Sequence, residues 1–431
     1  MPELSVIIPA WNEVENLSLL LPRLHEALGA LGIGYELLVA DAGSVDGTDK
    51  VCRAAGATFI DVGARGYGLA LVAGFRRAAG SFVLTMDADF SHPESFMRTL
   101  WERRGEADLL VASRYCPGGS ARMPLTRRWL SRTLNLLFSA GLHLPVRDCS
   151  SGYRLYRADV LAGIDIRARD FDALQEILIR THAHGYRILE VPFDYQPRRH
   201  GSSHARVLAF GVQYLKTFGR MWRLRNSIES GDYDLRAFDS RIPPQRWWQR
   251  RRHRIVTGFV AGAGPVLDVG CGSSRILGDL PAGSVGLDPN RDKLRHARRF
   301  DRPLVQGGLP QLPFGDGTFP AIVCSQVIEH IPSDEGLWRE FRRVLAPGGI
   351  LVLGTPDYGR LAWRITERVY GALVPGGYAD EHITRYTRRS LAAELAAAGF
   401  EILEYRYVGA GELILRCRSG AGGNQAPDSG G

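Results

Sequence analysis

Two carboxylates separated by one residue follow an apolar run in the first quarter of the chain. Residues 83–86 have the character of a buried strand, and Asp87 and Asp89 stand at its carboxyl end. In a parallel α/β sheet this edge binds ligands, and side-chain alternation would let both carboxylates flank one hard divalent cation with positions open to phosphate oxygens. The alternative is a solvated turn and a helix cap, because acidic pairs at strand ends are common.

A second stretch whose residues could bind a ligand lies in the other half of the chain. Residues 265–269 have strand character and run into a turn that contains Gly270 and Gly272, and a further strand-like run ends at Asp288, 20 residues after Asp268. This spacing fits a nucleoside bound over a Rossmann-like sheet, since glycines admit a ligand near the backbone and an acid accepts from ribose hydroxyls. A dinucleotide fold would give the same broad pattern.

The elements that must position the first acidic pair precede it in the chain. An opening strand enters a turn and a helix that ends near Gly29, a second strand ends in Asp41, and a third strand leads to a basic loop. The expected ranges are 4–10, 11–16, 35–40, 41–48, 58–62 and 65–70. The strand-to-helix turns should face one sheet edge, and the loop would let backbone N–H groups approach phosphates.

The composition predicts a folded chain of two domains. With 431 residues the chain is too long for one ordinary core, and its 45% hydrophobic and 23% charged residues are typical of soluble globular proteins. The net charge of +8 is local: from Lys216 to Arg254 there are eleven Lys or Arg and four Asp or Glu. Such a cluster suits phosphate, nucleic acid or an anionic membrane face, although basic runs are more often solvated surface.

The cysteines and the apolar runs indicate a cytoplasmic location. Six cysteines are scattered without Cys-x-x-Cys spacing, and we expect reduced thiols that neither pair nor bind metal. No apolar run is long enough to cross a bilayer, and the chain begins with a strand rather than a signal-peptide pattern.

The ordered motifs of the first half resemble the inverting glycosyltransferases of family 2, and most closely the dolichyl-phosphate mannose synthase group. The matching segments are 8–13, 41–48, 65–69, 87–89, 112–115, 148–154, Glu176 and 190–192. The resemblance implies a GT-A-like, Rossmann-type α/β domain for nucleotide-sugars over residues 1–226.

Carried over to this chain, the resemblance implies three sets of site residues. The nucleotide-sugar, GDP-mannose or UDP-glucose, would lie against Pro9, Asn12, Glu13 and Asp41; Mg²⁺ or Mn²⁺ would be held by Asp87 and Asp89; and the phosphate of a polyprenyl-phosphate acceptor would lie against Arg114, Arg127, Ser131 and Arg198. The expected catalytic residues are Asp89, Arg114 and Arg198. An acceptor phosphate is already negative, so its attack needs positioning and charge neutralisation more than a general base, and guanidinium groups grip phosphate bidentately.

Several alternatives and departures leave the donor open. Arg114 and Arg198 could be ordinary surface arginines, and the register around Arg127 and Ser131 is ambiguous. Ala42 stands where the family usually has a second aspartate, Ser91 where glutamine is frequent, and Ser203-His204 where the family has Ser-Lys. A histidine is only partly charged near neutral pH, which would weaken contact with phosphate.

Residues 205–222 predict an amphipathic helix, with apolar side chains at Val207, Leu208, Gly211, Leu215, Phe218 and Trp222. The helix could lie in a membrane interface, with Trp222, Trp247 and Trp248 near the headgroups, or its apolar face could pack on a domain. Residues 227–254, with a proline pair and an arginine run, predict a basic linker. Nucleic acid is an unlikely partner because no recognition motif or stacking platform accompanies the charge.

The second half resembles class I S-adenosylmethionine (SAM)-dependent methyltransferases over residues 255–418. The matching segments are 268–272, 312–316, 324–330 and 343–349. The resemblance implies a Rossmann-like α/β domain in which the methionine part of SAM would lie against Asp268, Gly270 and Gly272, the ribose against Asp288, and the transferred methyl near Glu329, His330 and His382. The alternative for both histidines is a structural hydrogen-bonding group. Residues 380–382 and 390–399 look like the substrate-side elements of that family.

Together these features predict a bifunctional cytoplasmic enzyme at the membrane surface. One domain would transfer a hexose to polyprenyl phosphate, and the other would methylate a small molecule or glycolipid, conceivably its partner's product. Alternatives are a soluble hydroxyl acceptor, which needs a general base that the sequence does not identify, or one silent domain that serves as a scaffold. The tail, residues 419–431, should be disordered.

Overall fold

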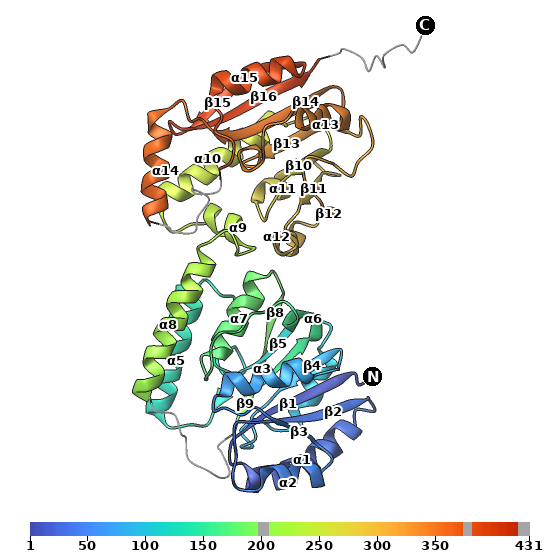
Figure 1. The fold of residues 1–431 in the computed structure, drawn as a ribbon, viewed down its shortest axis with the longest axis vertical. Coiled ribbons are helices and arrows are strands. Elements are labelled where there is room, and N and C mark those ends of the chain that lie inside the picture. Colours follow the sequence, from blue (N-terminus) through green and yellow to red (C-terminus); the bar gives the residue numbers. More distant parts are fainter. Residues whose placement is uncertain (197–206, 374–381, 421–431) are drawn as a thin grey trace. The chain divides into compact units, whose positions relative to one another are not determined.

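A computed structural model describes residues 1–196, 207–373 and 382–420 of the chain. The chain forms two compact units, Met1–Trp222 (unit 1) and Arg223–Gly431 (unit 2), each built around its own sheet (Figure 1).

Unit 1 is built on a seven-stranded, mostly parallel sheet. Its strands are β1 (Leu4–Ala10), β2 (Tyr35–Asp41), β3 (Thr58–Asp61), β4 (Phe82–Thr85), β5 (Leu109–Ser113), β7 (Arg154–Arg157) and β8 (Ile188–Pro192). Their order is β3-β2-β1-β4-β7-β5-β8, and β7 runs antiparallel to both neighbours. The strand order reverses between β1 and β4, and ligands of open α/β sheets bind in the crevice at such a switch point.

Helices cover the unit 1 sheet and bury its central strands. They are α1 (Val14–Gly29), α2 (Thr48–Ala54), α3 (Tyr67–Arg77), α4 (Phe96–Glu102), α5 (Leu125–Gly141), α6 (Ala158–Leu161), α7 (Ala173–Ala183) and α8 (Val207–Arg225); the short strands β6 (Ser120–Ala121) and β9 (Asp194–Tyr195) pair in parallel. Every residue of β1 is buried, as expected for a parallel strand covered on both faces. Leucines at helical spacing on α1 enter the core beside β1, among them Leu17, Leu21, Leu24 and Leu28.

Unit 2 repeats this architecture with an antiparallel edge. Its strands are β10 (Val266–Val269), β11 (Val285–Asp288), β12 (Leu304–Gln306), β13 (Phe319–Ser325), β14 (Leu345–Pro356), β15 (Phe400–Val408) and β16 (Glu412–Ser419). Their order is β12-β11-β10-β13-β14-β16-β15, and β16 runs antiparallel to β14 and β15. The switch point of this sheet lies between β10 and β13.

The helices of unit 2 begin earlier in the chain than its sheet does. They are α9 (Tyr233–Phe238), α10 (Pro243–Phe259), α11 (Arg275–Asp279), α12 (Arg291–Ala297), α13 (Glu335–Val344), α14 (Leu361–Leu373) and α15 (Arg388–Ala397), with the 3₁₀ turns η1 (Arg298–Phe300) and η2 (Ile328–His330).

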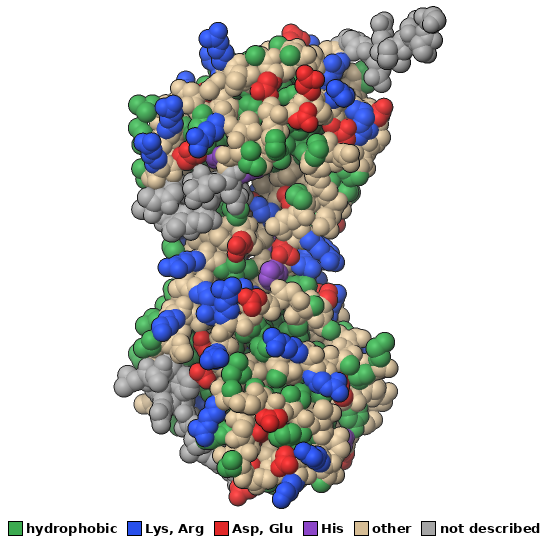
Figure 2. Space-filling model, in the orientation of Figure 1, with side chains coloured by type: hydrophobic (Ala, Val, Ile, Leu, Met, Phe, Trp, Pro, Cys, Tyr) green, Lys and Arg blue, Asp and Glu red, His purple; other side chains and the backbone are tan. Residues whose placement is uncertain are grey.

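Residues 227–254, for which a basic linker is predicted, fold as α9 and most of α10 within unit 2. The end of α10 buries Ile255 and Phe259 in the core, and Arg252 forms an ion pair with Glu412 of β16 at 2.5 Å. Arg250 likewise lies 3.9 Å from Asp239. Glu412, which is distant in sequence, and Asp239, which lies in the same segment, therefore offset part of the positive charge. Figure 2 shows Lys and Arg spread over the visible face of both units among Asp and Glu.

The expected strands and helices of both halves are present, and both units have the predicted α/β class. The strand predicted at residues 35–40 extends to Asp41, and the helix predicted at 390–399 is α15, which begins at Arg388. Of the predicted tail, Ser419 belongs to β16, while residues 421–431 lie outside the described residues. All six cysteines are buried free thiols. Among the described helices, none combines the length and apolarity needed to span a membrane.

Two candidate active sites

Asp87 and Asp89 lie in the turn that follows β4, at the switch point of the unit 1 sheet. The Tyr67 hydroxyl donates to Asp87 Oδ1 at 3.0 Å, and the Asp87 backbone N–H donates to His92 Nδ1 at 2.9 Å. Burial and the charge of Asp87 raise the pKa of Tyr67 well above its ordinary value, so the phenol stays a donor. Asp89 is buried and accepts from the Ser91 backbone N–H at 3.0 Å.

The surroundings of Asp87 fit a hard divalent cation. Carboxylate oxygens are the ligands that Mg²⁺ and Mn²⁺ prefer. Gly152 leaves space beside the pair, because a Cβ there would come within 3.3 Å of Asp87 Oδ1 and 2.6 Å of the Tyr67 hydroxyl. The residues present therefore match the predicted metal, although the metal site itself stays a prediction.

Hydrogen bonds join the turns that follow β1 and β2. The Asn12 side chain accepts from the Val45 backbone N–H at 3.0 Å, and the Asn12 N–H donates to the Ser44 hydroxyl at 2.6 Å. Asp41 is 2% exposed and accepts from the Ser44 N–H at 2.7 Å. Of the four residues predicted to line the nucleotide pocket, these contacts unite Asn12 and Asp41 through one loop.

The other two members of the predicted nucleotide pocket serve different local roles. Glu13 accepts from the Asn16 amide at 2.6 Å at the start of α1, and Pro9 is buried inside β1 opposite Ala40. Arg65 stacks over Trp11, with its guanidinium carbon 4.3 Å from the ring centroid, so the basic loop reaches the turn after β1.

Arg114 is held by a buried carboxylate. Its Nε and one terminal nitrogen donate to Asp148 at 2.8 and 2.7 Å, and the same terminal nitrogen donates to the Ser150 hydroxyl at 2.7 Å. Burial by itself raises the pKa of Asp148, but the Arg114 charge and hydrogen bonds outweigh it and leave the pKa below its ordinary value. Arg114 is thus fixed rather than a loose surface arginine.

Ser131 joins Arg114 through a short network. The Asn135 amide donates to the Ser150 hydroxyl at 3.0 Å and to the Ser131 backbone carbonyl at 2.9 Å. Arg127 lies one turn earlier on α5 and is exposed. The fourth predicted phosphate ligand, Arg198, lies outside the described residues, as do Ser203 and His204.

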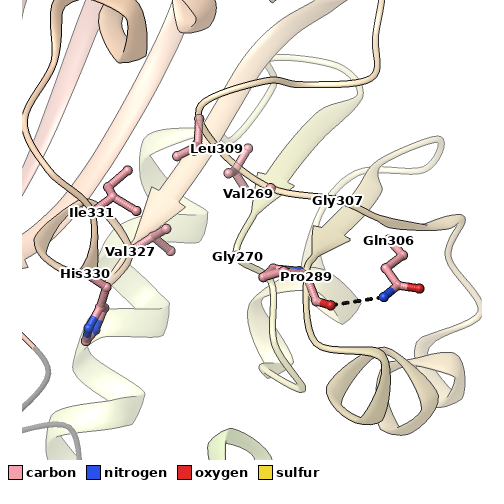
Figure 3. A pocket seen from close by; sticks show the side chains of 10 residues that line it. Val269, Gly270, Pro289, Gln306, Gly307, Leu309, Val327, His330 and Ile331 are labelled. Carbon is pink, nitrogen blue, oxygen red and sulfur yellow. Dashed lines mark hydrogen bonds between the residues drawn. The ribbon is translucent and has the colours of Figure 1, made fainter.

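A cavity of about 430 Å³ lies at the switch point of unit 2 (Figure 3). Two residues predicted from the sequence, Gly270 and His330, line it. Gly270 has φ +70°, and a Cβ there would lie 2.2 Å from the Val327 side chain, so this turn admits only glycine without displacing Val327.

Asp268 and Asp288 each precede a residue that lines this cavity: Asp268 comes before Val269 in β10, and Asp288 ends β11 before Pro289. One oxygen of Asp268 is buried without a hydrogen-bond partner among the described residues, whereas Asp288 accepts from the Gly272 N–H at 2.8 Å. Burial, together with the charge of Asp288, raises the pKa of Asp268 to about 7. A buried carboxylate with an unused oxygen beside a glycine turn suits the ammonium group of an amino-acid ligand, so the donor set fits SAM.

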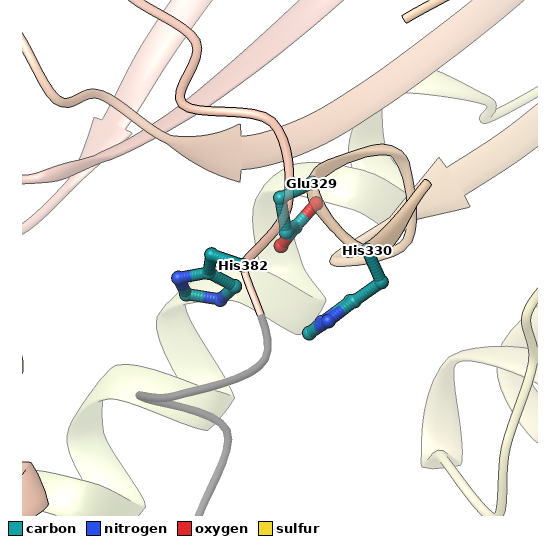
Figure 4. A group of neighbouring side chains, drawn as sticks. All are labelled: Glu329, His330 and His382. Carbon is teal, nitrogen blue, oxygen red and sulfur yellow. The ribbon is translucent and has the colours of Figure 1, made fainter. Parts of the chain in front are cut away.

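Glu329, His330 and His382 come together beside the cavity, although 52 residues separate the last two in the sequence (Figure 4). Each offers one nitrogen or oxygen within 4.8 Å of the others. Glu329 is 1% exposed, and burial raises its pKa to about 8. Of the adjoining residues predicted to lie on the substrate side, Asp380 and Glu381 lie outside the described residues.

Several residues of both sites were given no role from the sequence, although Tyr67 and Asp148 lie in segments that match the glycosyltransferase motifs. In unit 1 these are Tyr67, His92 and Asp148, and in unit 2 they are Gln306, Gly307, Gly308 and Leu309 of the cavity wall. The double glycine after a strand at 307–308 was an available signal, since loops after parallel strands line such sites.

The fold and the polar groups at the two switch points define the class of each unit. Unit 1 is a GT-A-like glycosyltransferase domain, and unit 2 is a methyltransferase domain. The family profile described as "Glycosyl transferase family 2" matches residues 5–164, and the one described as "Methyltransferase domain" matches residues 267–353.

Three curated relatives resemble unit 1. Polyprenol monophosphomannose synthase of Mycolicibacterium smegmatis is 35% identical over 52% of this chain and 90% of its own length. Undecaprenyl-phosphate mannosyltransferase of Micrococcus luteus is 36% identical over 46% of this chain and 85% of its own length. Dolichol-phosphate mannosyltransferase of Pyrococcus furiosus is 30% identical over 53% of this chain and 66% of its own length. The chain belongs to glycosyl transferase family 2, and it carries a methyltransferase domain after the glycosyltransferase domain.

Proposed function

We propose that unit 1 transfers a hexose, with mannose favoured over glucose, from a nucleotide-sugar to the phosphate of a polyprenyl phosphate, with inversion at the anomeric carbon. The observation that carries this proposal is the similarity of the unit to three relatives named as mannosyltransferases or mannose synthases of polyprenyl-type phosphates. The acidic pair at the switch point and the Arg114 network support it.

The residues of unit 1 divide the work of such a transfer. Asp87 and Asp89 would hold Mg²⁺ or Mn²⁺, which when bound neutralises charge on the departing diphosphate. Tyr67 holds Asp87 in place, and Asp148 holds the Arg114 guanidinium in one orientation. Arg114, with Ser131 and Arg127 on α5, would position the acceptor phosphate, whose own negative oxygen is the nucleophile.

A transfer assay with two donors tests the proposal. The full chain is incubated with radiolabelled GDP-mannose or UDP-glucose, Mn²⁺ and a polyprenyl phosphate, and label is counted in the lipid extract. We expect more lipid-soluble label from GDP-mannose than from UDP-glucose. Label that stays water-soluble and does not need the lipid would instead favour a soluble hydroxyl acceptor.

We propose that α5 and α8 bring unit 1 to the cytosolic face of a membrane. The two helices lie side by side (Figure 1), and the Phe138 ring of α5 packs edge-on against Phe218 of α8 with centroids 5.5 Å apart. Large apolar side chains nevertheless stay exposed on both helices: Leu125, Trp129, Leu130, Leu136 and Leu137 on α5, and Val212, Leu215 and Trp222 on α8. Apolar helix surface flanked by arginines suits an anionic interface.

Removing two of these side chains should weaken membrane binding. Each large apolar side chain inserted in an interface contributes on the order of 1 kcal/mol, so Trp129→Ser with Leu136→Ser should lower partitioning into anionic vesicles by about thirty-fold. Vesicle sedimentation measures this. Leu19→Ser, which changes an exposed leucine of α1, is the matched control and should bind like the wild type. Equal binding by the double variant would contradict the role of these helices.

We propose that unit 2 binds SAM in the cavity at its switch point and transfers the methyl group to an acceptor. Asp268 would pair with the ammonium group of the cofactor, Gly270 and Gly272 would admit its methionine part, and Asp288 would accept from the ribose. When bound, SAM supplies an electrophilic methyl group. His330, which lines the cavity, lies at the opposite end from Gln306 (Figure 3).

The pKa of Asp268 makes SAM affinity depend on pH. With a pKa of about 7 in the folded chain against about 3.9 when unfolded, the group stabilises the fold below pH 4, and that contribution is lost as pH rises to 7. An ammonium ligand binds the ionised form, so the Kd for SAM should fall about eight-fold from pH 6 to 7.5. Isothermal titration calorimetry checks this. Asp268→Asn should bind more weakly at both values, and the same pH dependence in that variant would contradict the assignment.

An amphipathic acceptor, such as the glycolipid made by unit 1, is favoured for unit 2. Apolar side chains at helical spacing are exposed on α14, namely Leu361, Ile365 and Val369, and the same helix carries Glu367, which hydrogen-bonds to His382. Methyl label from SAM in the lipid product of GDP-mannose transfer would support coupling of the two reactions. If neither unit accepts the product of the other, the coupling is refuted. If every measurable reaction of the wild type persists in Asp268→Asn, unit 2 is a binding module.

A further inference from the structure

We propose that Glu329, His330 and His382 bind one divalent transition-metal ion of the Zn²⁺ type at the edge of the cavity in unit 2. The inference deepens the proposed methyl transfer and rests on it for its role, but not for its test. The three side chains converge on one point from η2 and from the segment before α15 (Figure 4).

The buried carboxylate of Glu329 is the first feature that favours a bound cation. Its side chain is 1% exposed, and neither carboxylate oxygen has a partner at full hydrogen-bond geometry among the described residues, although the Thr355 hydroxyl lies near enough to lower the pKa of Glu329 against the larger effect of burial. Buried carboxylates are normally paired, hydrogen-bonded or bound to a metal, because an isolated one is costly. Figure 4 shows this carboxylate directed toward the two imidazole rings.

His382 is prepared as a ligand by its neighbours on the other side of the ring. Its Nδ1 lies 3.0 Å from Glu367 Oε1 and 2.6 Å from the Tyr358 hydroxyl. A carboxylate that accepts the Nδ1–H fixes the tautomer in which Nε2 carries the lone pair. This carboxylate–histidine arrangement is the one that orients histidine ligands of metals.

Backbone pairing sets the spacing of the ligands. The N–H groups of Ile383 and Thr384 donate to the Glu329 carbonyl at 2.8 and 3.0 Å, which holds His382 against η2. The Thr384 hydroxyl also donates to the Ile331 carbonyl at 2.6 Å. The site therefore belongs to a hydrogen-bonded frame, as a preorganised site requires.

The donor set selects the class of metal. Two imidazoles and one carboxylate form a common three-residue zinc site with an open fourth position, and they suit neighbouring first-row ions as well. In tetrahedral geometry, ligands about 2.0–2.2 Å from an ion lie roughly 3.3–3.6 Å apart. The three ligand atoms lie within 4.8 Å of one another, so small side-chain rotations would bring them to these distances. Because His330 also lines the cavity, the ion would border the space proposed for the cofactor and acceptor.

The open position would take a hydroxyl of the acceptor and lower its pKa. The hydroxyl proton passes to water, the oxygen forms a bond to the methyl carbon of SAM, and the carbon–sulfur bond breaks with its electron pair left on S-adenosylhomocysteine. The inferred substrate class is therefore an alcohol or enol that can reach the ion.

Titration of the full chain with CoCl₂ tests the site, after chelator treatment and without nucleotide. Cobalt bound by histidine at low coordination number absorbs strongly in the visible, whereas an oxygen-only site at Asp87 and Asp89 would absorb weakly. We expect one such chromophore per chain, displaced by ZnCl₂, lost in Glu329→Gln and His382→Gln, and kept in Asp89→Asn and in the exposed control Glu401→Gln. Glu367→Gln, which keeps all three ligands, should bind about 10- to 100-fold more weakly.

Circular dichroism and SAM titration on the same samples separate the outcomes. If Glu329→Gln or His382→Gln unfolds, Glu367→Gln decides, and unchanged cobalt affinity in that variant overturns the site. A wild-type chain that binds SAM but forms no chromophore overturns the metal inference alone. A chain that forms the chromophore but binds no SAM overturns the proposed methyl transfer and leaves the metal site standing.

Discussion

Asp89→Asn should lower the rate of mannosyl transfer by about a thousand-fold, with little change in folding. The substitution keeps the size of a buried side chain in the turn after β4, but it removes one of the two anionic ligands proposed for the cation. A metal clamp on a diphosphate contributes several kcal/mol, and roughly 4 kcal/mol corresponds to this factor. Initial rates of lipid labelling at saturating Mn²⁺ provide the measurement.

The matched control for Asp89→Asn is Asp61→Asn, at the end of β3 in the same sheet. Asp61 is exposed and accepts from the Gly63 backbone N–H at 2.9 Å, so its replacement should change the rate by no more than about two-fold. Equal rates for Asp89→Asn and the wild type would show that the acidic pair does not carry the metal.

Asp148→Asn should destabilise unit 1 by about 3–5 kcal/mol, because it leaves the charge of Arg114 buried without its partner. The Asp148 side chain is 0% exposed and that of Arg114 11%, and their ion pair consists of two side-chain hydrogen bonds. Urea unfolding followed through unit 1 measures the loss. Activity should fall too, since Arg114 loses the group that orients it.

Asp159→Asn is the control for Asp148→Asn, because it removes a carboxylate from an exposed pair. Asp159 lies 2.8 Å from Arg157, with side chains 50% and 48% exposed, and such pairs contribute less than about 1 kcal/mol. Similar losses in the two variants would mean that burial does not distinguish these pairs.

The strands and the acids at their ends could be predicted because each is marked by a short, continuous stretch of sequence. An uninterrupted apolar run such as β1 is typical of a strand covered on both faces. Asp41, Asp87 and Asp268 lie within two residues of the carboxyl ends of their strands, so the sequence itself marks these ends. The antiparallel insertion of β7 between β4 and β5 was not predicted, since pairing partners are not encoded in one strand's periodicity.

The contacts that complete the sites join residues far apart in sequence. Arg114 meets Asp148 across 34 positions, and Arg252 meets Glu412 across 160. Basic residues that look like a solvated run in the sequence can therefore be paired in the fold. For this reason residues 227–254 were predicted to be a linker, whereas they form helices. For the 205–222 helix, the predicted packing on a domain is seen where Phe218 contacts Phe138 of α5, whereas Leu215 is 66% exposed and the membrane alternative stays a prediction. Residues 205–206 and the side chains of Val207 and Leu208 lie outside the described part.

The most direct test of the central claim compares polyprenyl phosphate with the corresponding polyprenol as acceptor. The full chain, radiolabelled GDP-mannose and Mn²⁺ are kept constant, and lipid-soluble label is counted over time. We predict label only with the phosphate, because the proposed role of Arg114 and its network is to position an acceptor that already carries its negative charge. Equal labelling of the alcohol, or labelling of the alcohol alone, would contradict it and would require a general base in unit 1.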